Sequence, residues 1–431
     1  MVVAGSRIVE LVPAGAEPAT PDMRVFDAGR HVVIPGLINT HHHAYQTLTR
    51  ALPAAMDKGL FGWLRALYPV WARLTPGALD AAATVAFAEL LLSGCTTTAD
   101  HHYVFPSGLE HAIDIEIAAA QTLGIRAHVT RGSMNLSERD GGLPPDSVVQ
   151  NAETILADSA RLIAAHHERG EEARIQVALA PCSPFTVTPE LMRDTAALAD
   201  LLDVRLHTHL AETADEGAFC EHRFGCRPVD HLERQGWLTQ RTWIAHGVHL
   251  DAGEWQRLAR AKVSVAHCAC SNQVLGSGHC PVCDLEAAGV SVGLGVDGSA
   301  SNNASNMMSE VRAAFLLQRG RYGVARVSHR DALRWATEGG AVCLGRPELG
   351  RIAVGAQADL ALFTLEELRF SGAGDPVAAL ILCGAQRADR VMVGGRWVVV
   401  DGAIPGLDLP ALLARHGAAS RDMCRSATTA R

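Results

Sequence analysis

The chain has 431 residues, of which 48% are hydrophobic and 19% are charged, so it is long enough for more than one domain and a large buried core. Its formal net charge of −8 excludes the basic surface that nucleic-acid binding requires. No apolar stretch reaches the roughly 18 residues that a membrane-spanning helix needs, because Glu89 interrupts the longest one. We therefore expect neither a nucleic acid nor a membrane as partner.

The cysteines and the N-terminus both point to a reducing compartment. The 11 cysteines are odd in number and scattered, and the first residues lack the basic start and apolar middle of a secretory signal. These observations predict reduced thiols and a cytoplasmic location. The pairs Cys268/Cys270 and Cys280/Cys283 are weak candidates for a structural metal site, because only one residue separates the first pair.

From about residue 36 to residue 349, short apolar runs alternate with longer amphipathic stretches. Eight of these runs are candidate strands: 34–43, 94–100, 126–130, 175–180, 205–209, 242–246, 263–268 and 290–297. Helical periodicity is clearest between them in residues 81–92, 153–167 and 189–202. Strands that alternate with helices in this way predict an α/β fold, a TIM-like (β/α)8 barrel.

A helical pattern of apolar and aromatic residues lies in the long interval between the first two candidate strands. Its members are Phe61, Trp63, Leu64, Leu67, Tyr68 and Trp71. Such a helix can simply bury one face in the core. It can also form a lid over a substrate pocket, since long loops at the top of a barrel build active sites.

The two ends of the chain carry short alternating strands separated by turn residues. The candidates are residues 6–12, 23–34, 358–363 and 390–401, the last with a hairpin at Gly394-Gly395. We expect residues 1–35 and 350–431 to form one small β-sandwich domain beside a catalytic barrel domain of residues 36–349. From about Ser420 the sequence has no pattern, and we expect a loose tail there.

Ionisable residues collect at the C-terminal ends of the candidate barrel strands, where such barrels place catalytic groups. His41 and His43 end the first strand, His209 ends the fifth and Asp297 ends the eighth. Alternation along a strand puts His41 and His43 on one side and His42 on the other. Three imidazoles and a carboxylate, with one position left for water, suit a catalytic site for a metal such as zinc. Each of these residues is weak evidence alone, and their occurrence at one end of the barrel carries the prediction.

Several of these residues lie in motifs that resemble those of the amidohydrolase superfamily. The motifs are PGLINTHHH at 35–43, HTHLAE at 207–212, AHG at 245–247 and GVD at 295–297. The fourth strand ends in LAP at 179–181, without a lysine that could bridge two metals, so the pattern resembles the mononuclear deaminase and triazine-hydrolase group.

The resemblance implies one divalent metal ion and a set of catalytic residues. The ion is zinc, with Fe2+ as the alternative, bound by His41, His43, His209 and Asp297. Glu212 matches the proton shuttle, His246 the residue that holds the attacking water or the developing oxyanion, and Asp297 accepts the proton of the water.

Within this group the chain is most similar to the branch that deaminates 8-oxoguanine. The similar segments are HAYQTLTR at 43–50, LFGWL at 60–64, DHHY at 100–103 and GSASN at 298–302. The resemblance implies a small heterocyclic substrate, 8-oxoguanine, which is converted to urate and ammonia, with isoguanine or guanine as further substrates. It also implies that Gln46, Trp63, His101 and Tyr103 contact the substrate, and that the chain forms a homo-oligomer.

Three alternatives stay open at this point. A triazine or hydroxyatrazine amino- or chlorohydrolase would use the same metal site and release an alkylamine or chloride. A deaminase of adenosine-type nucleosides would need room for a ribose. A non-catalytic scaffold would typically lack some of the metal ligands, whereas this chain has all four.

Overall fold

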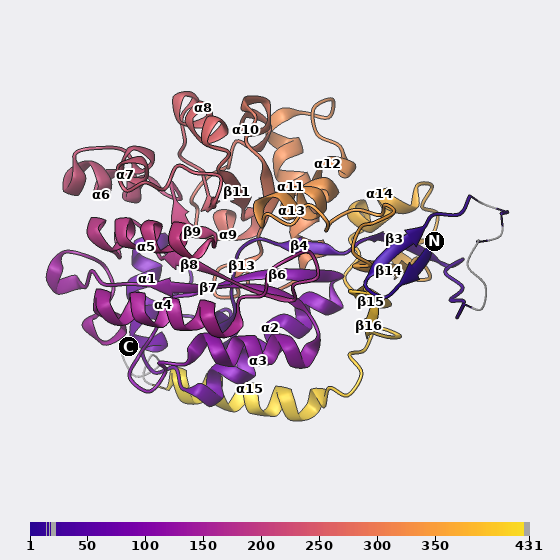
Figure 1. The fold of residues 1–431 in the computed structure, drawn as a ribbon, viewed down its shortest axis with the longest axis horizontal. Helices are drawn as coiled ribbons and strands as arrows, with labels where there is room; N and C mark the ends of the chain where they lie inside the picture. Colours follow the sequence, from indigo (N-terminus) through magenta and orange to yellow (C-terminus); the bar gives the residue numbers. More distant parts are fainter. Residues whose placement is uncertain (14, 17, 19–22, 426–431) are drawn as a thin grey trace.

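The computed structural model describes residues 1–13, 15–16, 18 and 23–425. Its centre is a closed barrel of eight parallel strands surrounded by helices (Figure 1). In pairing order the strands are β4 (Leu37–Asn39), β6 (Cys95–His102), β7 (Arg126–Ser133), β8 (Ile175–Pro181), β9 (Leu206–Leu210), β10 (Thr242–His246), β11 (Ser264–His267) and β12 (Val292–Leu294), and β12 pairs with β4. The predicted (β/α)8 barrel is confirmed, and each of the eight candidate segments contributes one barrel strand.

Helices cover the outside of the barrel, in the connections between its strands and after the last of them. They are α1 (Leu60–Trp71), α2 (Pro76–Leu92), α3 (Ala112–Leu123), α4 (Ala152–His166), α5 (Pro189–Leu202), α6 (Ala214–Phe224), α7 (Pro228–Arg234), α8 (Ala252–Ala261), α9 (Ala269–Val274), α10 (Val282–Ala288), α11 (Met307–Tyr322), α12 (His329–Arg334) and α13 (Gly340–Cys343). Side-chain caps begin some of these helices: Asn151 caps α4, and Thr188 caps α5 with a proline next in the chain. In the part of the chain that the structure describes, none of the helices is long and apolar enough to cross a membrane.

Two of the candidate strands are interrupted in the structure. Residues 34–43 divide among β3 (His31–Pro35), β4 and β5 (His42–His43), and residues 290–297 divide between β12 and β13 (Asp297–Gly298). Glycines mark the break between β3 and β4 and the break between β12 and β13. A Cβ on Gly36 would lie 2.1 Å from Thr96 Oγ1, and a Cβ on Gly295 would lie 2.7 Å from His41 Cβ. Close approach of neighbouring chain segments therefore ends these strands earlier than their apolar pattern suggests.

Both ends of the chain contribute to a small antiparallel sheet beside the barrel (Figure 1). The strand order of this sheet is β16 (Arg396–Val399), β15 (Arg390–Val393), β14 (Leu360–Thr364) and β3. A separate hairpin consists of β1 (Val2–Ala4) and β2 (Arg7–Glu10). An isolated antiparallel bridge links Arg7 of this hairpin to Gln357, which lies shortly before β14 in the chain. On β14, Leu360 and Leu362 enter a small separate core, whereas Ala361 and Phe363 enter the large core. We propose on this basis that residues 1–35 and most of 350–431 form a separate β domain.

The C-terminal segment then leaves this sheet. After α14 (Pro376–Leu382) and β16, helix α15 (Leu409–Cys424) runs along the barrel side of the molecule and packs on α2 (Figure 1). Ser420 Oγ donates to the carbonyl of Leu48 at 2.7 Å, and His416 Nε2 lies 3.1 Å from Thr47 Oγ1. The expected loose tail is therefore wrong for residues 420–424, which are helical. Residues 426–431 lie outside the described residues.

Candidate active site

Three histidines and one aspartate converge at the C-terminal end of the barrel. His43 Nε2 lies 3.1 Å from His209 Nε2 and 3.2 Å from Asp297 Oδ1. His41 Nε2 lies 3.4 Å from the same carboxylate oxygen. All four side chains are buried. The structure thus brings together the four residues that the sequence analysis expects to bind a metal.

Two residues of the site hold a strained backbone conformation. Asp297 has a φ of 60°, and His246 at the end of β10 has a φ of 74°. A left-handed conformation at such residues costs on the order of 1–3 kcal/mol and persists where the surroundings enforce it. One such constraint is the hydrogen bond from Asp297 N to the carbonyl of His41, at 3.0 Å. Strain of this kind is typical of functional sites.

The ring nitrogens that face away from the cluster have fixed partners. His43 Nδ1 donates to the carbonyl of His101 at 2.6 Å, and His209 Nδ1 donates to that of Cys182 at 2.6 Å. A carbonyl only accepts, so in the neutral form of either ring Nε2 presents a lone pair to the cluster. His41 Nε2 is buried and has no hydrogen-bond partner among the described residues. Lone pairs that meet a carboxylate in this way fit a divalent metal ion.

The electrostatics of the cluster also favour a cation. Burial lowers the pKa of His41 to about 3 and holds that of His209 well below its usual range, so both rings are neutral. Burial opposes ionisation of Asp297, but the His41 and His43 rings beside it hold its pKa well below the usual value. Burial also lowers the pKa of His43, yet the bond to Asp297 outweighs this and raises it. An ionised carboxylate among imidazoles therefore attracts a positive charge.

Glu212 and His246 lie beside this cluster. Glu212 Oε2 is 3.4 Å from His246 Nε2, and Glu212 Oε1 accepts from Ser277 Oγ at 3.4 Å. His246 Nδ1 lies 2.9 Å from Asn272 Oδ1, which orients the ring with Nε2 toward Glu212. Burial raises the pKa of Glu212 to about 8, and the charge of Asp297 adds to this. The carboxyl can therefore hold a proton at neutral pH.

The cluster of histidines and aspartate opens into a pocket. Its lining consists of His43, Gln46, Leu60, Trp63, Leu64, Tyr68, Tyr103, Cys182, Phe185, His209, Glu212, His246, Leu275, Asp297 and Ser301. Four of these residues come from helix α1, so the aromatic helix covers the pocket as well as part of the core. Three of the four expected substrate contacts, Gln46, Trp63 and Tyr103, line this pocket. Trp63 presents only its ring, because its Nε1 donates to the carbonyl of Ala300 at 3.3 Å.

The fourth expected contact, His101, does not line the pocket. Its side chain is fully buried, Nε2 donates to the carbonyl of Ala180 at 3.0 Å, and the ring stacks on His209 at 4.8 Å. Tyr103 directly follows β6 and lies two residues after His101, a separation of about 6.6 Å along an extended chain. His101 is therefore one layer deeper in the barrel and supports His209 from behind.

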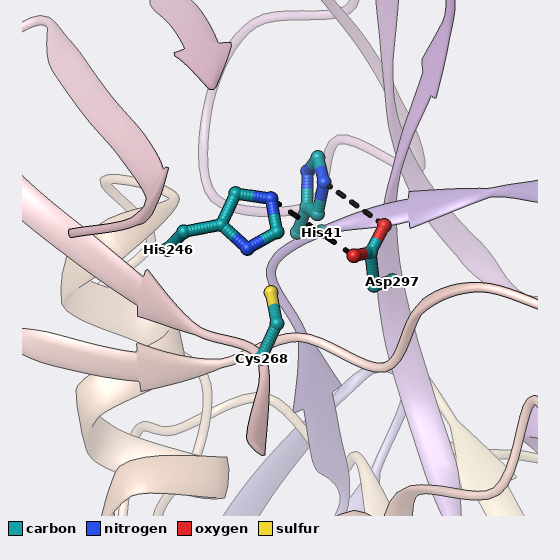
Figure 2. Close-up of side chains that lie close together, drawn as sticks. All are labelled: His41, His246, Cys268 and Asp297. Carbon is teal, nitrogen blue, oxygen red and sulfur yellow. Dashed lines mark ion pairs between the residues drawn. The ribbon is translucent and has the colours of Figure 1, made fainter. Parts of the chain in front are cut away.

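Cys268 is a neighbour of the cluster that the sequence analysis did not place there. Its sulfur lies in one group with ligand atoms of His41, His246 and Asp297, all within 4.8 Å of one another, and Figure 2 shows these four side chains turned toward each other. The other members of the two cysteine pairs join no such group in the described part of the chain. The available signal was its position directly after β11, at the same end of the barrel as the histidines.

Known proteins share this arrangement of the chain. A family model described as "Amidohydrolase family" matches residues 32–398. The 8-oxoguanine deaminase of Pseudomonas aeruginosa is 63% identical over 420 residues, which cover 97% of this chain and 94% of that protein. Hydroxydechloroatrazine ethylaminohydrolase of a Pseudomonas species is 38% identical over 388 residues, with coverage of 87% and 79%. The crystal structure of atrazine chlorohydrolase TrzN from Arthrobacter aurescens TC1, complexed with zinc, superposes with a TM-score of 0.92 at 33% identity and covers 97% of this chain and 94% of that chain.

These similarities run along nearly the whole chain rather than through isolated motifs. They confirm the resemblance inferred from the sequence motifs, and they confirm the expected class of enzyme, a hydrolase that acts on carbon–nitrogen bonds. The chain belongs to the amidohydrolase family.

Proposed function

We propose that this protein is a metal-dependent hydrolytic deaminase of an amino-substituted purine, with 8-oxoguanine as the best candidate. Water replaces the amino group, which yields urate and ammonia. The observation that carries the proposal is 63% identity to an 8-oxoguanine deaminase over 97% of the chain. The site supports it, because a histidine and aspartate cluster, a buried acid and a flat aromatic wall meet in one pocket.

In this proposal His41, His43, His209 and Asp297 hold one divalent metal ion. Zinc is the first candidate, since three imidazole nitrogens and a carboxylate suit it and the structure of TrzN contains it. Fe2+ is the alternative. When bound, the ion supplies a nucleophile at neutral pH by lowering the pKa of water from about 15.7 to about 7.

The side chains around the cluster then move the protons. Asp297 takes a proton from the attacking water, and Glu212 gives one to the ring nitrogen beside the attacked carbon. His246 Nε2, 3.4 Å from Glu212, holds the attacking water as a hydrogen-bond acceptor, because Nδ1 of this ring donates to the amide oxygen of Asn272. Glu212 then takes the remaining proton of the attacking oxygen and gives it to the amino group, which leaves as ammonia while the carbonyl forms. The proton on Asp297 returns to Glu212 and restores the starting state.

Two buried polar groups of the pocket wall are available to bind the substrate. Gln46 Nε2 lies 3.5 Å from the hydroxyl of Tyr45, while Gln46 Oε1 has no partner among the described residues. The hydroxyl of Tyr68 is also without a partner there. Gly298 makes room for the amide, since a Cβ there would lie 1.8 Å from Gln46 Oε1. Buried polar groups of this kind favour a ligand that supplies the missing hydrogen bonds.

Tyr68→Phe is expected to raise the KM for 8-oxoguanine about 10-fold and to change kcat little, because a lost hydrogen bond in a buried pocket costs about 1–3 kcal/mol. Burial raises the pKa of Tyr68 well above its usual value, so the hydroxyl keeps its proton and can donate it. Steady-state kinetics on the purified variant measure the effect. Tyr322→Phe is the matched control, since its hydroxyl bonds Asp284 outside the pocket. An unchanged KM in Tyr68→Phe would exclude this contact.

The proposed function is tested by ammonia release from the purified protein. The panel is 8-oxoguanine, isoguanine, guanine, cytosine and aminotriazines, with the metal content measured on the same sample. We expect one metal ion per chain and the highest kcat/KM with 8-oxoguanine. A metal-loaded sample that releases no ammonia from any of these compounds contradicts the deaminase proposal.

A triazine amino- or chlorohydrolase is the second candidate. The similarity to hydroxydechloroatrazine ethylaminohydrolase and to atrazine chlorohydrolase favours it. The same panel separates the two candidates, because the second one releases an alkylamine or chloride instead of ammonia. Helix α1 closes over the pocket through Leu60, Trp63, Leu64 and Tyr68, which argues against a substrate that carries a ribose.

Cellular location and assembly complete the proposal. All 11 cysteines are free thiols, which supports a cytoplasmic location. We also propose a homo-oligomer, which light scattering on the purified protein tests.

A further inference from the structure

His207 contacts the side of His41 that faces away from the proposed metal. It lies on β9 two residues before His209 and is fully buried. Its Nε2 is 2.8 Å from His41 Nδ1, and its Nδ1 is 2.8 Å from the carbonyl of Trp243. The three groups form one hydrogen-bonded chain that leads from the backbone of β10 to His41.

The carbonyl at the end of this chain decides where each hydrogen lies. A carbonyl only accepts, so the hydrogen between His207 and Trp243 belongs to His207 Nδ1. In the neutral ring, His207 Nε2 is then an acceptor, and the hydrogen between the two rings belongs to His41 Nδ1. His41 Nε2 therefore carries a lone pair. This is the same atom that is buried without a partner beside Asp297.

The opposite arrangement would disable His41 as a ligand. If His207 Nε2 carried a hydrogen, His41 Nδ1 would have to accept it, and the hydrogen of the neutral His41 ring would lie on Nε2. That nitrogen could not bind a metal. His43 and His209 obtain the correct tautomer directly from backbone carbonyls, whereas His41 obtains it through a second side chain.

Trp243 holds His207 in place by two further contacts. The imidazole of His207 stacks on the indole, with ring centroids 4.4 Å apart and an angle of 18° between the planes. The indole Nε1 of Trp243 donates to the carbonyl of Thr40 at 3.0 Å, directly before His41 in the chain. Trp243 therefore fixes both the ring of His207 and the backbone that carries His41.

A second metal between these rings is the rival interpretation. Ligand atoms of His41, His101 and His207 lie within 4.8 Å of one another, so they form a candidate group of their own. The distance of 2.8 Å between His41 Nδ1 and His207 Nε2 is that of a hydrogen bond. Two nitrogens on one tetrahedral zinc ion, each at about 2.05 Å, would be about 3.3 Å apart. In addition, His101 Nε2 already donates to the carbonyl of Ala180.

We propose that His207 is a positioning residue that sets the tautomer of His41 and thereby strengthens metal binding. The inference rests on the proposed function only in that His41 is a metal ligand; it does not depend on which heterocycle is the substrate.

The test is the zinc dissociation constant of the full chain, measured by competition with a chelator, together with the number of zinc ions per chain. His207→Phe keeps the stacking on Trp243 and removes the acceptor, so we expect zinc to bind about 10–100-fold more weakly. His207→Gln places an amide oxygen near the former Nε2, and we expect it to restore binding to within about threefold, since the acceptor is retained. His231→Leu is the matched control, because His231 is equally buried but stacks on Phe224 away from the site.

Three results overturn the proposal. The first is wild-type affinity in a folded His207→Phe variant, and the second is an equal loss in His207→Gln and His207→Phe. The third is binding of two zinc ions by the wild type and of one by His207→Phe, which makes His207 a ligand. If His207→Phe does not fold, as judged by circular dichroism, His207→Leu carries the same expectation. A wild-type chain that binds no metal contradicts the proposed metal site itself, and a metal-loaded chain without deaminase activity contradicts only the substrate.

Discussion

Glu212→Gln is expected to lower kcat about 10²–10⁴-fold and to leave the metal content unchanged, because the amide keeps the shape of the side chain but cannot deliver a proton. The carboxyl lies 3.4 Å from His246 Nε2 and 3.4 Å from Ser277 Oγ, and it lies outside the four proposed ligands. Its pKa, raised to about 8 by burial, suits a group that gives and takes a proton at neutral pH. Ammonia release and elemental analysis on one preparation measure both effects.

The control for this variant is Glu254→Gln. Glu254 is also a buried glutamate, but it pairs with Arg227 at 2.7 Å on helix α8, away from the pocket. We expect near wild-type kcat in the control. Near wild-type kcat in Glu212→Gln itself would remove Glu212 from the mechanism and would leave the metal site in place.

His209→Ala is expected to weaken metal binding by more than about 100-fold, since changes behind the ligands alone typically cost about 10–100-fold. His209 Nε2 lies 3.1 Å from His43 Nε2, and its ring is fixed from behind by the carbonyl of Cys182 and by His101. Alanine removes one of the four proposed donors. Activity should fall with the metal content to below detection.

Thermal unfolding gives a second measurement for the same variant. A ligand that binds only the folded chain raises the Tm, so added zinc should stabilise the wild type and not His209→Ala. His231→Ala, another buried histidine outside the site, should respond to zinc as the wild type does. Full metal occupancy in His209→Ala would show that the ligand set is different.

The barrel could be predicted from the sequence because each of its strands is a short apolar run between helices. Where the strands end could not be predicted in the same way. Residues 34–43 were one candidate strand, but the chain leaves the small sheet at Gly36, where Thr96 comes too close for any side chain. The hydrophobic pattern of a segment predicts which of its residues are buried. The point at which a strand is interrupted depends instead on a residue that is distant in sequence, here Thr96.

The candidate site shows the same division. Strand alternation correctly grouped His41 with His43, and His42 instead lies 3.0 Å from Asp100. Strand alternation does not predict how deep in the barrel a side chain lies, and for this reason His101 was expected in the pocket. Cys268 was considered only as part of a cysteine pair, because its spacing carries no information about the histidines on other strands. Their proximity arises from closure of the barrel.

Helix α15 has a consequence for how the site is completed during synthesis. Its hydrogen bond from Ser420 to Leu48 joins residues 372 positions apart, and Leu48 lies in the turn of Ala44–Thr49 that carries Gln46. Domains begin to fold while the ribosome is still adding residues. The proposed metal ligands, which end at Asp297, can therefore assemble on the nascent chain well before this outer support emerges. The turn that carries Gln46 therefore receives its contact with Ser420 only after the proposed ligands have been made.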